Sequence, residues 1–168
     1  MMFRRTSPDR RRMIAIHEAG HAVAGDLLGL KVIRIARPVG YGREAVAVFE
    51  SQGPDDSRES LQAWIRVCVA GQVAAERLSA AQEPSVTAGV DPSEGTGRDY
   101  AIAREYAGRL GDSEQQIDAA RHDVNRMFMR SNTWETVEAI ASMLVEHDEV
   151  TTEQLQAALT QARVQQPG

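Results

Sequence analysis

Residues 13–29, MIAIHEAGHAVAGDLLG, place His17, Glu18 and His21 in the spacing H-E-x-x-H inside a segment with helical periodicity. Residues four apart on a helix are neighbours, so the two histidines project side by side and can both reach one ion. Zinc binds imidazole nitrogen readily, and a catalytic zinc site keeps three protein ligands and one open position for water. Glu18 follows His17 directly, so its side chain is rotated by roughly 100° about the helix axis relative to that of His17. Its carboxylate can therefore reach a water on the metal, rather than the metal, and act as a base.

The alternative interpretation of this segment is a pair of core histidines satisfied by hydrogen bonds, with Glu18 at the edge of the solvent-facing side. The helical stripe that contains the histidines also contains Met13, Ala24 and Leu28. We therefore expect His17 and His21 to point into the protein on either interpretation. An H-E-x-x-H spacing arises by chance in roughly one chain in several hundred, so the motif favours the metal site.

Two glycines, Gly20 and Gly25, interrupt the same helix. Each glycine costs roughly 1 kcal/mol relative to alanine in a helix interior. The sequence therefore predicts that another element approaches the backbone of this helix closely at both positions.

A third metal ligand has to come from elsewhere in the chain. The metzincin pattern requires a glycine three residues after the second histidine and a histidine six residues after it, but Ala24 and Leu27 occupy these positions. The remaining histidines are His122 and His147. Both lie in polar stretches that are typical of a protein surface. The metzincin arrangement is therefore excluded.

Two carboxylates are the better candidates, Glu76 in GQVAAERL and Asp99 in EGTGRDYAIA. Asp99 follows a long loop and opens a helix, which suits a ligand that folds back onto an earlier element. It also fits a capping box that begins at Thr96. Glu76 has an alternative role as the partner of an arginine, such as Arg77 or a neighbour. Spacing alone places Asp99 only slightly ahead.

The rest of the chain predicts a mainly α-helical domain with one small β-hairpin or sheet inserted after the first helix. Two segments rich in β-branched residues flank VGYG and predict the hairpin. A stretch rich in Gly, Pro, Ser and Thr predicts a long loop over about 80–97, of a kind that often carries function. Candidate residues that open helices are Ser7, Ser57, Thr96, Ser113, Thr133 and Thr151 or Thr152, and candidate stops are Gly29 and Gly111. The expected helices cover about 8–28, 58–79 and 97–110 and then begin near residues 113, 133 and 151, and the expected strands cover about 31–37 and 44–50.

Composition bounds the class of protein. A chain of 168 residues with 42% apolar residues is typical of a single soluble domain. The net charge of −5 argues against nucleic acid as the main partner. We see no signal peptide and no apolar run long enough to cross a bilayer, so we expect a cytoplasmic protein without direct membrane insertion. Cys68 is the single cysteine, which excludes an internal disulfide, and its apolar neighbours predict an inert core thiol.

Three stretches of this sequence resemble the peptidase domain of FtsH, the membrane-bound ATP-dependent zinc metalloprotease. They are HEAGHA at 17–22, GQVAAERL at 71–78 and TGRDYAIAREYAGRLG at 96–111. Their order and spacing hold across about 13–162. The resemblance implies a single peptidase domain over 13–162, preceded by a basic flank and helix start over 1–12 and followed by a tail over 163–168. We expect the arginines of the flank to be solvated or to contact an acidic partner surface.

Carried over position by position, the resemblance implies one Zn²⁺ per chain, held by His17, His21 and Asp99, with Glu18 as general base. Glu76 matches a glutamate near the zinc helix, where it would help to orient a ligand. FtsH also carries a membrane anchor and an ATPase module. This sequence contains neither, and it has no G-x-x-x-x-G-K-[ST] motif. The resemblance therefore extends to the hydrolytic site and not to the unfolding of substrates.

The function expected from these features is a soluble zinc metallopeptidase that hydrolyses peptides or unfolded protein segments without its own ATPase. We expect the hairpin strand at 44–50 to bind substrate as an added strand. A homo-oligomer or a separate unfoldase partner is compatible with this expectation. The alternative is a catalytically idle domain that serves as a zinc-containing binding or assembly module.

Overall fold

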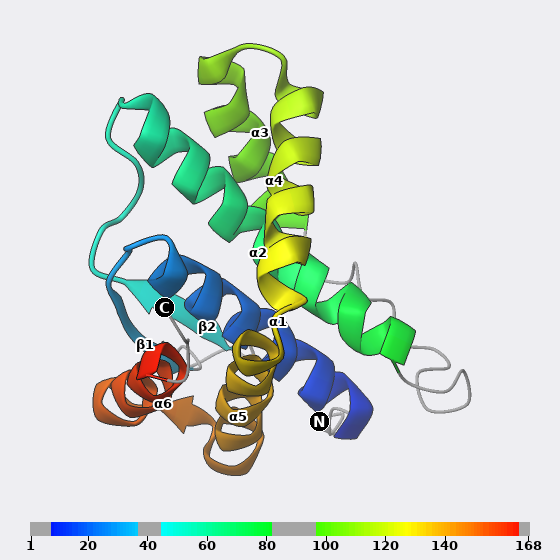
Figure 1. The fold of residues 1–168 in the computed structure, drawn as a ribbon, viewed down its shortest axis with the longest axis vertical. Helices are drawn as coiled ribbons and strands as arrows, with labels where there is room; N and C mark the ends of the chain where they lie inside the picture. Colours follow the sequence, from blue (N-terminus) through cyan, green and yellow to red (C-terminus); the bar gives the residue numbers. More distant parts are fainter. Residues whose placement is uncertain (1–7, 37–44, 82–96, 165–168) are drawn as a thin grey trace, which may run out of the picture.

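Helix α1 (Pro8–Leu27) carries the H-E-x-x-H segment and lies in the middle of the computed structural model (Figure 1). The structure describes residues 8–36, 45–81 and 97–164. In these ranges the other helices are α2 (Arg58–Ala81), α3 (Gly97–Leu110), α4 (Ser113–Phe128), α5 (Ser131–His147) and α6 (Thr152–Val164). The strands are β1 (Val32–Ala36), β2 (Val46–Phe49) and β3 (Glu149–Val150). The prediction of a mainly helical domain with a small sheet after the first helix is confirmed.

Helices α1 and α2 pack closely at Gly20. A Cβ built on Gly20 would lie 2.7 Å from the Cβ of Ala74 and 3.0 Å from the backbone oxygen of Ala70. A Cβ built on Gly25 would collide with the ring of Phe49, which belongs to β2. The predicted close approaches at both glycines are confirmed. They hold α2 and the sheet against the helix that carries the two histidines.

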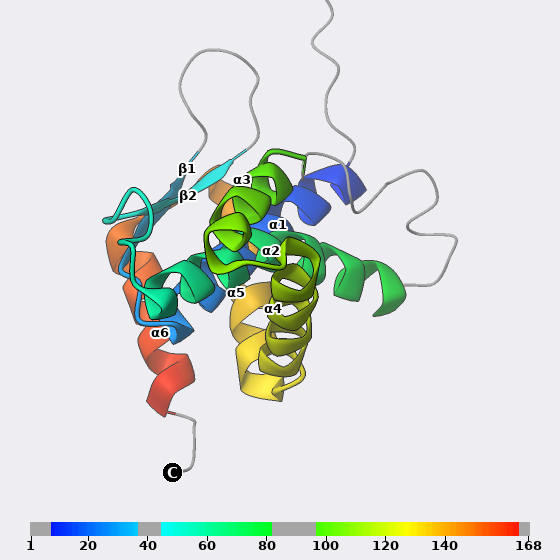
Figure 2. The ribbon, with the colours of Figure 1, turned by 90° about the horizontal axis from the view of Figure 1, so that it is seen from above.

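The remaining helices surround this central pair. Helices α3 and α4 pack on α2, whereas α5 packs on α1 and α6 packs on α5 and β1 (Figures 1 and 2). Fully buried side chains from four helices meet in one core, among them Ile16, Val69, Val124 and Ile140. Among the described residues, no helix combines the length and the apolar character that a bilayer crossing requires.

The sheet is antiparallel in the order β2-β1-β3, so β2 is an edge strand. The predicted hairpin is confirmed: Ile35 pairs with Ala47, and Ala36 pairs with Val46. The third strand was not expected from the sequence. It contains two residues and follows Asp148, whose φ of 59° ends α5 in the left-handed region. A two-residue strand is too short to show the alternation on which strand prediction depends.

Several expected helix ends are confirmed. The amide of Ser60 donates to the hydroxyl of Ser57 at 3.2 Å, and the amide of Gln154 donates to the hydroxyl of Thr151 at 3.3 Å. Gly29 and Gly111 follow α1 and α3 with φ values of 80° and 107°, which glycine adopts without strain. The expected caps at Ser7 and Thr96 and the loop at 82–96 lie outside the described residues.

Two expected helix starts need correction. Helix α4 begins at Ser113 as predicted, but the carboxylate of Asp112 is the cap, because it accepts from the amide of Gln115 at 3.1 Å. The prediction that Thr133 opens α5 is wrong. Helix α5 begins at Ser131, and Thr133 is 2% exposed. Thr133 therefore faces the core and does not cap.

Two arginines of the basic flank contact the rest of the protein. The guanidinium of Arg11 donates to the carbonyl of Val145 at 2.9 Å and to Asp148 at 3.1 Å. Arg12 lies 3.9 Å from Glu138. These two side chains remain partly exposed, at 37% and 39%, while they link α1 to α5.

The single cysteine is buried, as predicted. Burial, with a smaller contribution from the charge of Asp99, raises the pKa of Cys68 to about 12. The thiol is therefore protonated and a poor nucleophile at neutral pH.

Candidate metal centre

Helix α1 presents the two histidines side by side. His17 and His21 are 9% and 7% exposed, and their rings stand nearly perpendicular with centroids 4.7 Å apart. The prediction that both side chains point into the protein is confirmed. The spacing of four residues accounts for their proximity, and the packing of α2 on α1 accounts for their burial.

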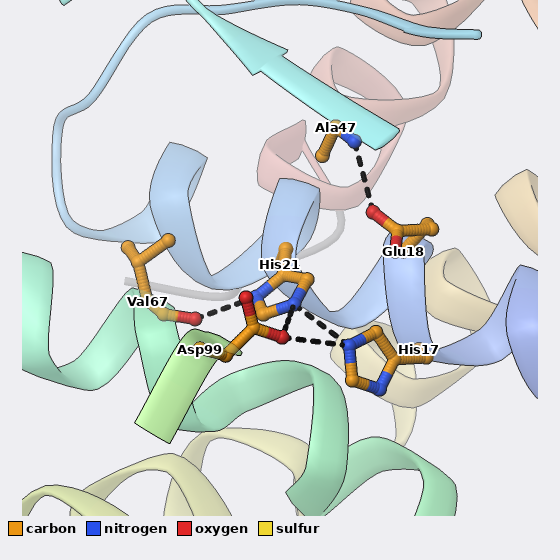
Figure 3. Close-up of polar contacts among 6 residues, drawn as sticks. All are labelled: His17, Glu18, His21, Ala47, Val67 and Asp99. Atoms are coloured by element: carbon orange, nitrogen blue, oxygen red, sulfur yellow. Dashed lines mark hydrogen bonds and ion pairs between the residues drawn. The ribbon is translucent and has the colours of Figure 1, made fainter. Parts of the chain in front are cut away.

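Asp99, in the first turn of α3, joins the histidines. Its Oδ2 lies 3.1 Å from Nε2 of His17 and 3.2 Å from Nε2 of His21. The two Nε2 atoms are 3.0 Å apart. Figure 3 shows the three side chains converging from α1 and α3. The structure thus brings Asp99, rather than Glu76, to the histidines.

These three atoms have the separations expected of ligands on one ion. Ligands about 2.0–2.1 Å from a tetrahedral zinc lie roughly 3.3–3.4 Å from one another. The observed 3.0 to 3.2 Å is within a few tenths of an ångström of that spacing. Two imidazoles and a carboxylate suit zinc and several other divalent metals. Among the described residues, His17, His21 and Asp99 therefore form a possible metal site whose ion the structure does not identify.

A backbone carbonyl fixes the tautomer of His21. Its Nδ1 lies 2.6 Å from the carbonyl oxygen of Val67 on α2, and only a protonated Nδ1 can donate to a carbonyl. In the neutral ring, Nε2 then carries the free lone pair and faces Asp99 and His17. A contact of this kind orients an imidazole for metal binding.

Gly71 of α2 lies against the Nε2 atoms of the two histidine rings. A Cβ built there would lie 2.5 Å from Nε2 of both His17 and His21, a distance that requires something to shift. This close contact was not predicted at Gly71. A glycine in the interior of a helix indicates that another element approaches its backbone closely, as at Gly20, and the same reasoning applies to Gly71.

The site without a metal binds a proton tightly. Burial lowers the pKa of His21, but the hydrogen bond to Asp99 and the charges of Glu18 and Asp99 outweigh burial and raise it to about 9. Burial raises the pKa of Asp99, but the hydrogen bonds to His17 and His21 outweigh it and hold this pKa well below its usual range. A proton between His21 and Asp99 thus occupies the place that a metal ion would take.

Glu18 lies beside this cluster and is held by the sheet. Its Oε2 accepts a hydrogen bond of 2.9 Å from the backbone amide of Ala47, and Figure 3 shows its carboxylate directed toward β2. Burial raises the pKa of Glu18, while the nearby histidines and the Ala47 amide oppose the rise. A carboxylate with a raised pKa is a stronger base than one in water.

Glu76 does not join the metal cluster. One carboxylate oxygen accepts from Gln72 at 2.7 Å, and the other accepts from Arg121 at 2.6 Å. The expected pairing with an arginine is thus found, with Arg121 of α4 as the partner. Arg77 instead lies over the ring of Trp134, 5.0 Å from its centroid. A role for Glu76 in orienting a metal ligand stays a prediction.

The other histidines, His122 and His147, are exposed, as predicted.

A scan against protein-family models finds no match for this chain, and a search among curated proteins finds no significantly similar sequence.

Proposed function

We propose that the chain is a zinc metallopeptidase that resembles the peptidase domain of FtsH and hydrolyses peptides or unfolded protein segments. The observation that carries this proposal is the triangle of His17 Nε2, His21 Nε2 and Asp99 Oδ2, with sides of 3.0, 3.1 and 3.2 Å. Two ligands and an adjacent glutamate on one helix, with a third ligand from a later helix, suit a hydrolytic zinc site.

The three ligands would hold zinc, which when bound polarises a carbonyl and lowers the pKa of water. Glu18 is the residue assigned to proton transfer. Its place next to His17 on α1 suits its carboxylate to take a proton from the attacking water and to pass that proton to the leaving amine. The absence of a side chain at Gly71 leaves space beside the Nε2 atoms of both histidines.

The position of β2 at the edge of the sheet supports a substrate that binds as an added strand. The amide of Ala47 donates to Glu18 and therefore points away from β1, so a substrate would pair with other backbone groups of this edge. Val46, next to it, is 47% exposed. An extended peptide paired with this edge would lie beside the proposed base, and backbone pairing tolerates many side chains.

Glu18→Gln tests the proposed role of Glu18. The amide keeps the shape of the side chain but cannot accept a proton, so we expect zinc to remain bound while cleavage of casein or a quenched peptide falls by at least about 100-fold. Zinc content and cleavage rate are measured on the same preparation. The control is Glu105→Gln, the same chemical change on the exposed face of α3, where Glu105 pairs with Arg109.

Three results are distinguishable in that experiment. A Glu18→Gln variant that cleaves as fast as the parent contradicts the assigned base. A parent chain that binds no zinc contradicts the metal site. A parent chain that binds zinc but cleaves no peptide in a broad library supports the alternative function, an idle zinc-containing binding or assembly module.

A further inference from the structure

Arg121 of α4 joins three helices near the metal centre. Its Nη1 donates to the hydroxyl of Tyr100 on α3, and its Nη2 donates to Oε2 of Glu76 on α2 at 2.6 Å. The side chains of Arg121 and Glu76 are only 27% and 36% exposed. Partial burial makes a charge-assisted contact stronger than one on an open surface.

Glu76, the partner of Arg121 on α2, is itself held in place. The second oxygen of Glu76 accepts from Gln72 at 2.7 Å, one turn earlier on the same helix. Both oxygens of Glu76 are thus engaged, one by its own helix and one by Arg121. Since Arg121 donates from two different nitrogens, it links Tyr100 to a carboxylate whose position is already set.

The contact between Arg121 and Tyr100 lies next to the proposed metal ligand Asp99. Tyr100 follows Asp99 directly, and both lie in the first turn of α3, which begins at Gly97. Asp99 Oδ2 has to stay about 3.1 Å from His17 Nε2 for the three ligands to share one ion. A contact that fixes Tyr100 relative to α2 also fixes the start of α3, and therefore the place of Asp99.

We infer that Arg121, through Tyr100 and Glu76, is a positioning residue that holds Asp99 against the two histidines and so sets the metal affinity of the site. This inference rests on the metal centre of the proposed function and adds to it three residues that do not touch the metal. Partners of metal ligands typically change affinity by about 10–100-fold when they are removed.

Charge and position make opposite predictions for Arg121. Removing a positive charge near a cation site favours the cation, so a purely electrostatic role predicts tighter metal binding in Arg121→Met. A positioning role predicts weaker binding, because Asp99 is no longer held in place. Tyr100→Phe removes only the hydroxyl and leaves the net charge unchanged, which isolates the positioning effect.

A matched control is the ion pair between Arg66 and Asp123. Arg66 of α2 donates from Nε and Nη2 to Oδ2 of Asp123 on α4, at 2.9 and 2.8 Å. This pair joins the same two helices as Glu76 and Arg121, with similar exposures of 25% and 34%. Arg66→Met therefore removes an equal charge and a comparable contact, but it leaves Tyr100 and the start of α3 in place.

The experiment measures Zn²⁺ affinity by competition with a chromogenic chelator for the parent chain, Arg121→Met, Tyr100→Phe and Arg66→Met. We expect affinity to fall about 10–100-fold in Arg121→Met and by a smaller factor in Tyr100→Phe, and to stay unchanged in Arg66→Met. Substitution with Co²⁺ gives a second measurement, since a displaced Asp99 alters the visible absorption of the bound ion.

Each outcome decides the inference. Equal affinities in Arg121→Met and Arg66→Met, or tighter binding in Arg121→Met, overturn it while the metal site stands. A parent chain that binds no Zn²⁺ overturns both the inference and the proposed function. If Arg121→Met does not fold, Tyr100→Phe decides, and an affinity and Co²⁺ spectrum equal to those of the parent overturn the inference.

Discussion

At the scale of single residues, the metal site depends on the absence of a side chain at Gly71 as well as on its three ligands. Gly71 leaves open the space beside both Nε2 atoms of the histidine pair. Any other residue would place a Cβ within 2.5 Å of both nitrogens. Because Gly71 lies on α2 and the histidines on α1, the rings would have to turn or the helices would have to separate.

Gly71→Ala is therefore expected to abolish stoichiometric metal binding while the helical content is retained. Metal content after dialysis and far-ultraviolet circular dichroism measure the two properties. The control is Gly108→Ala on α3, where the nearest atom to the new Cβ is Ser113 Oγ at 3.8 Å. There we expect unchanged metal binding and a gain in stability of up to about 1 kcal/mol. Full metal occupancy in Gly71→Ala contradicts the role given to this glycine.

At the scale of elements, the crossing of α1 and α2 brings the two histidines to Val67 and Gly71. The crossing is close because Gly20 faces Ala74 and the carbonyl of Ala70. Small residues on both helices permit this distance, so the position of the site depends on a contact between helices that contributes no ligand.

Gly20→Ala is expected to destabilise the fold by about 1–3 kcal/mol, because the new methyl overpacks the crossing. Ala74→Gly removes the Cβ that the new methyl meets at 2.7 Å. The double variant should therefore lose less stability than the sum of the two single variants. Urea unfolding of all four proteins measures the coupling. If the losses in the free energy of unfolding are additive, the side chains at positions 20 and 74 are not in contact.

At the scale of the whole molecule, a metal ion would join helices that are far apart in sequence. His21 and Asp99 are separated by 78 residues. A metal that binds the folded chain stabilises it by mass action, so removal by a chelator is expected to lower Tm. The same ligands bind protons in the metal-free chain, which makes the effect depend on pH.

The sign of that dependence follows from the pKa of His21, which is raised from 6.5 to about 9 in the metal-free chain. Its proton stabilises the metal-free fold fully below about pH 6.5, and this contribution is lost as pH rises toward 9. Metal competes with the proton. The rise in Tm on adding Zn²⁺ should therefore be larger at about pH 8 than at about pH 6, as thermal unfolding with and without chelator will show. A larger rise at the lower pH would contradict this account.

Local features of the fold followed from the sequence. Glycines at 29 and 111 ended helices, Ser57 and Thr151 capped them, and β-branched residues marked β1 and β2. Sequence reasoning failed where the deciding contact was distant. Thr133 has the chemistry of a cap, but burial against the core placed it inside α5. Strand β3 forms because Val150 pairs with Ile35 of β1. A segment of two residues is too short for the sequence pattern to predict this pairing.

The candidate metal site likewise has a part that the sequence determined and a part that the tertiary structure determined. The sequence by itself determined that His17 and His21 lie together and that Glu18 lies beside them, because helix geometry fixes residues one turn apart. Spacing alone placed Asp99 only slightly ahead of Glu76, and the resemblance to FtsH then favoured Asp99. The tertiary structure brought Asp99 to the histidines, set Gly71 against their Nε2 atoms and placed Arg121 between Tyr100 and Glu76. These residues come from α2, α3 and α4, and only the packing of whole helices sets the distances between them.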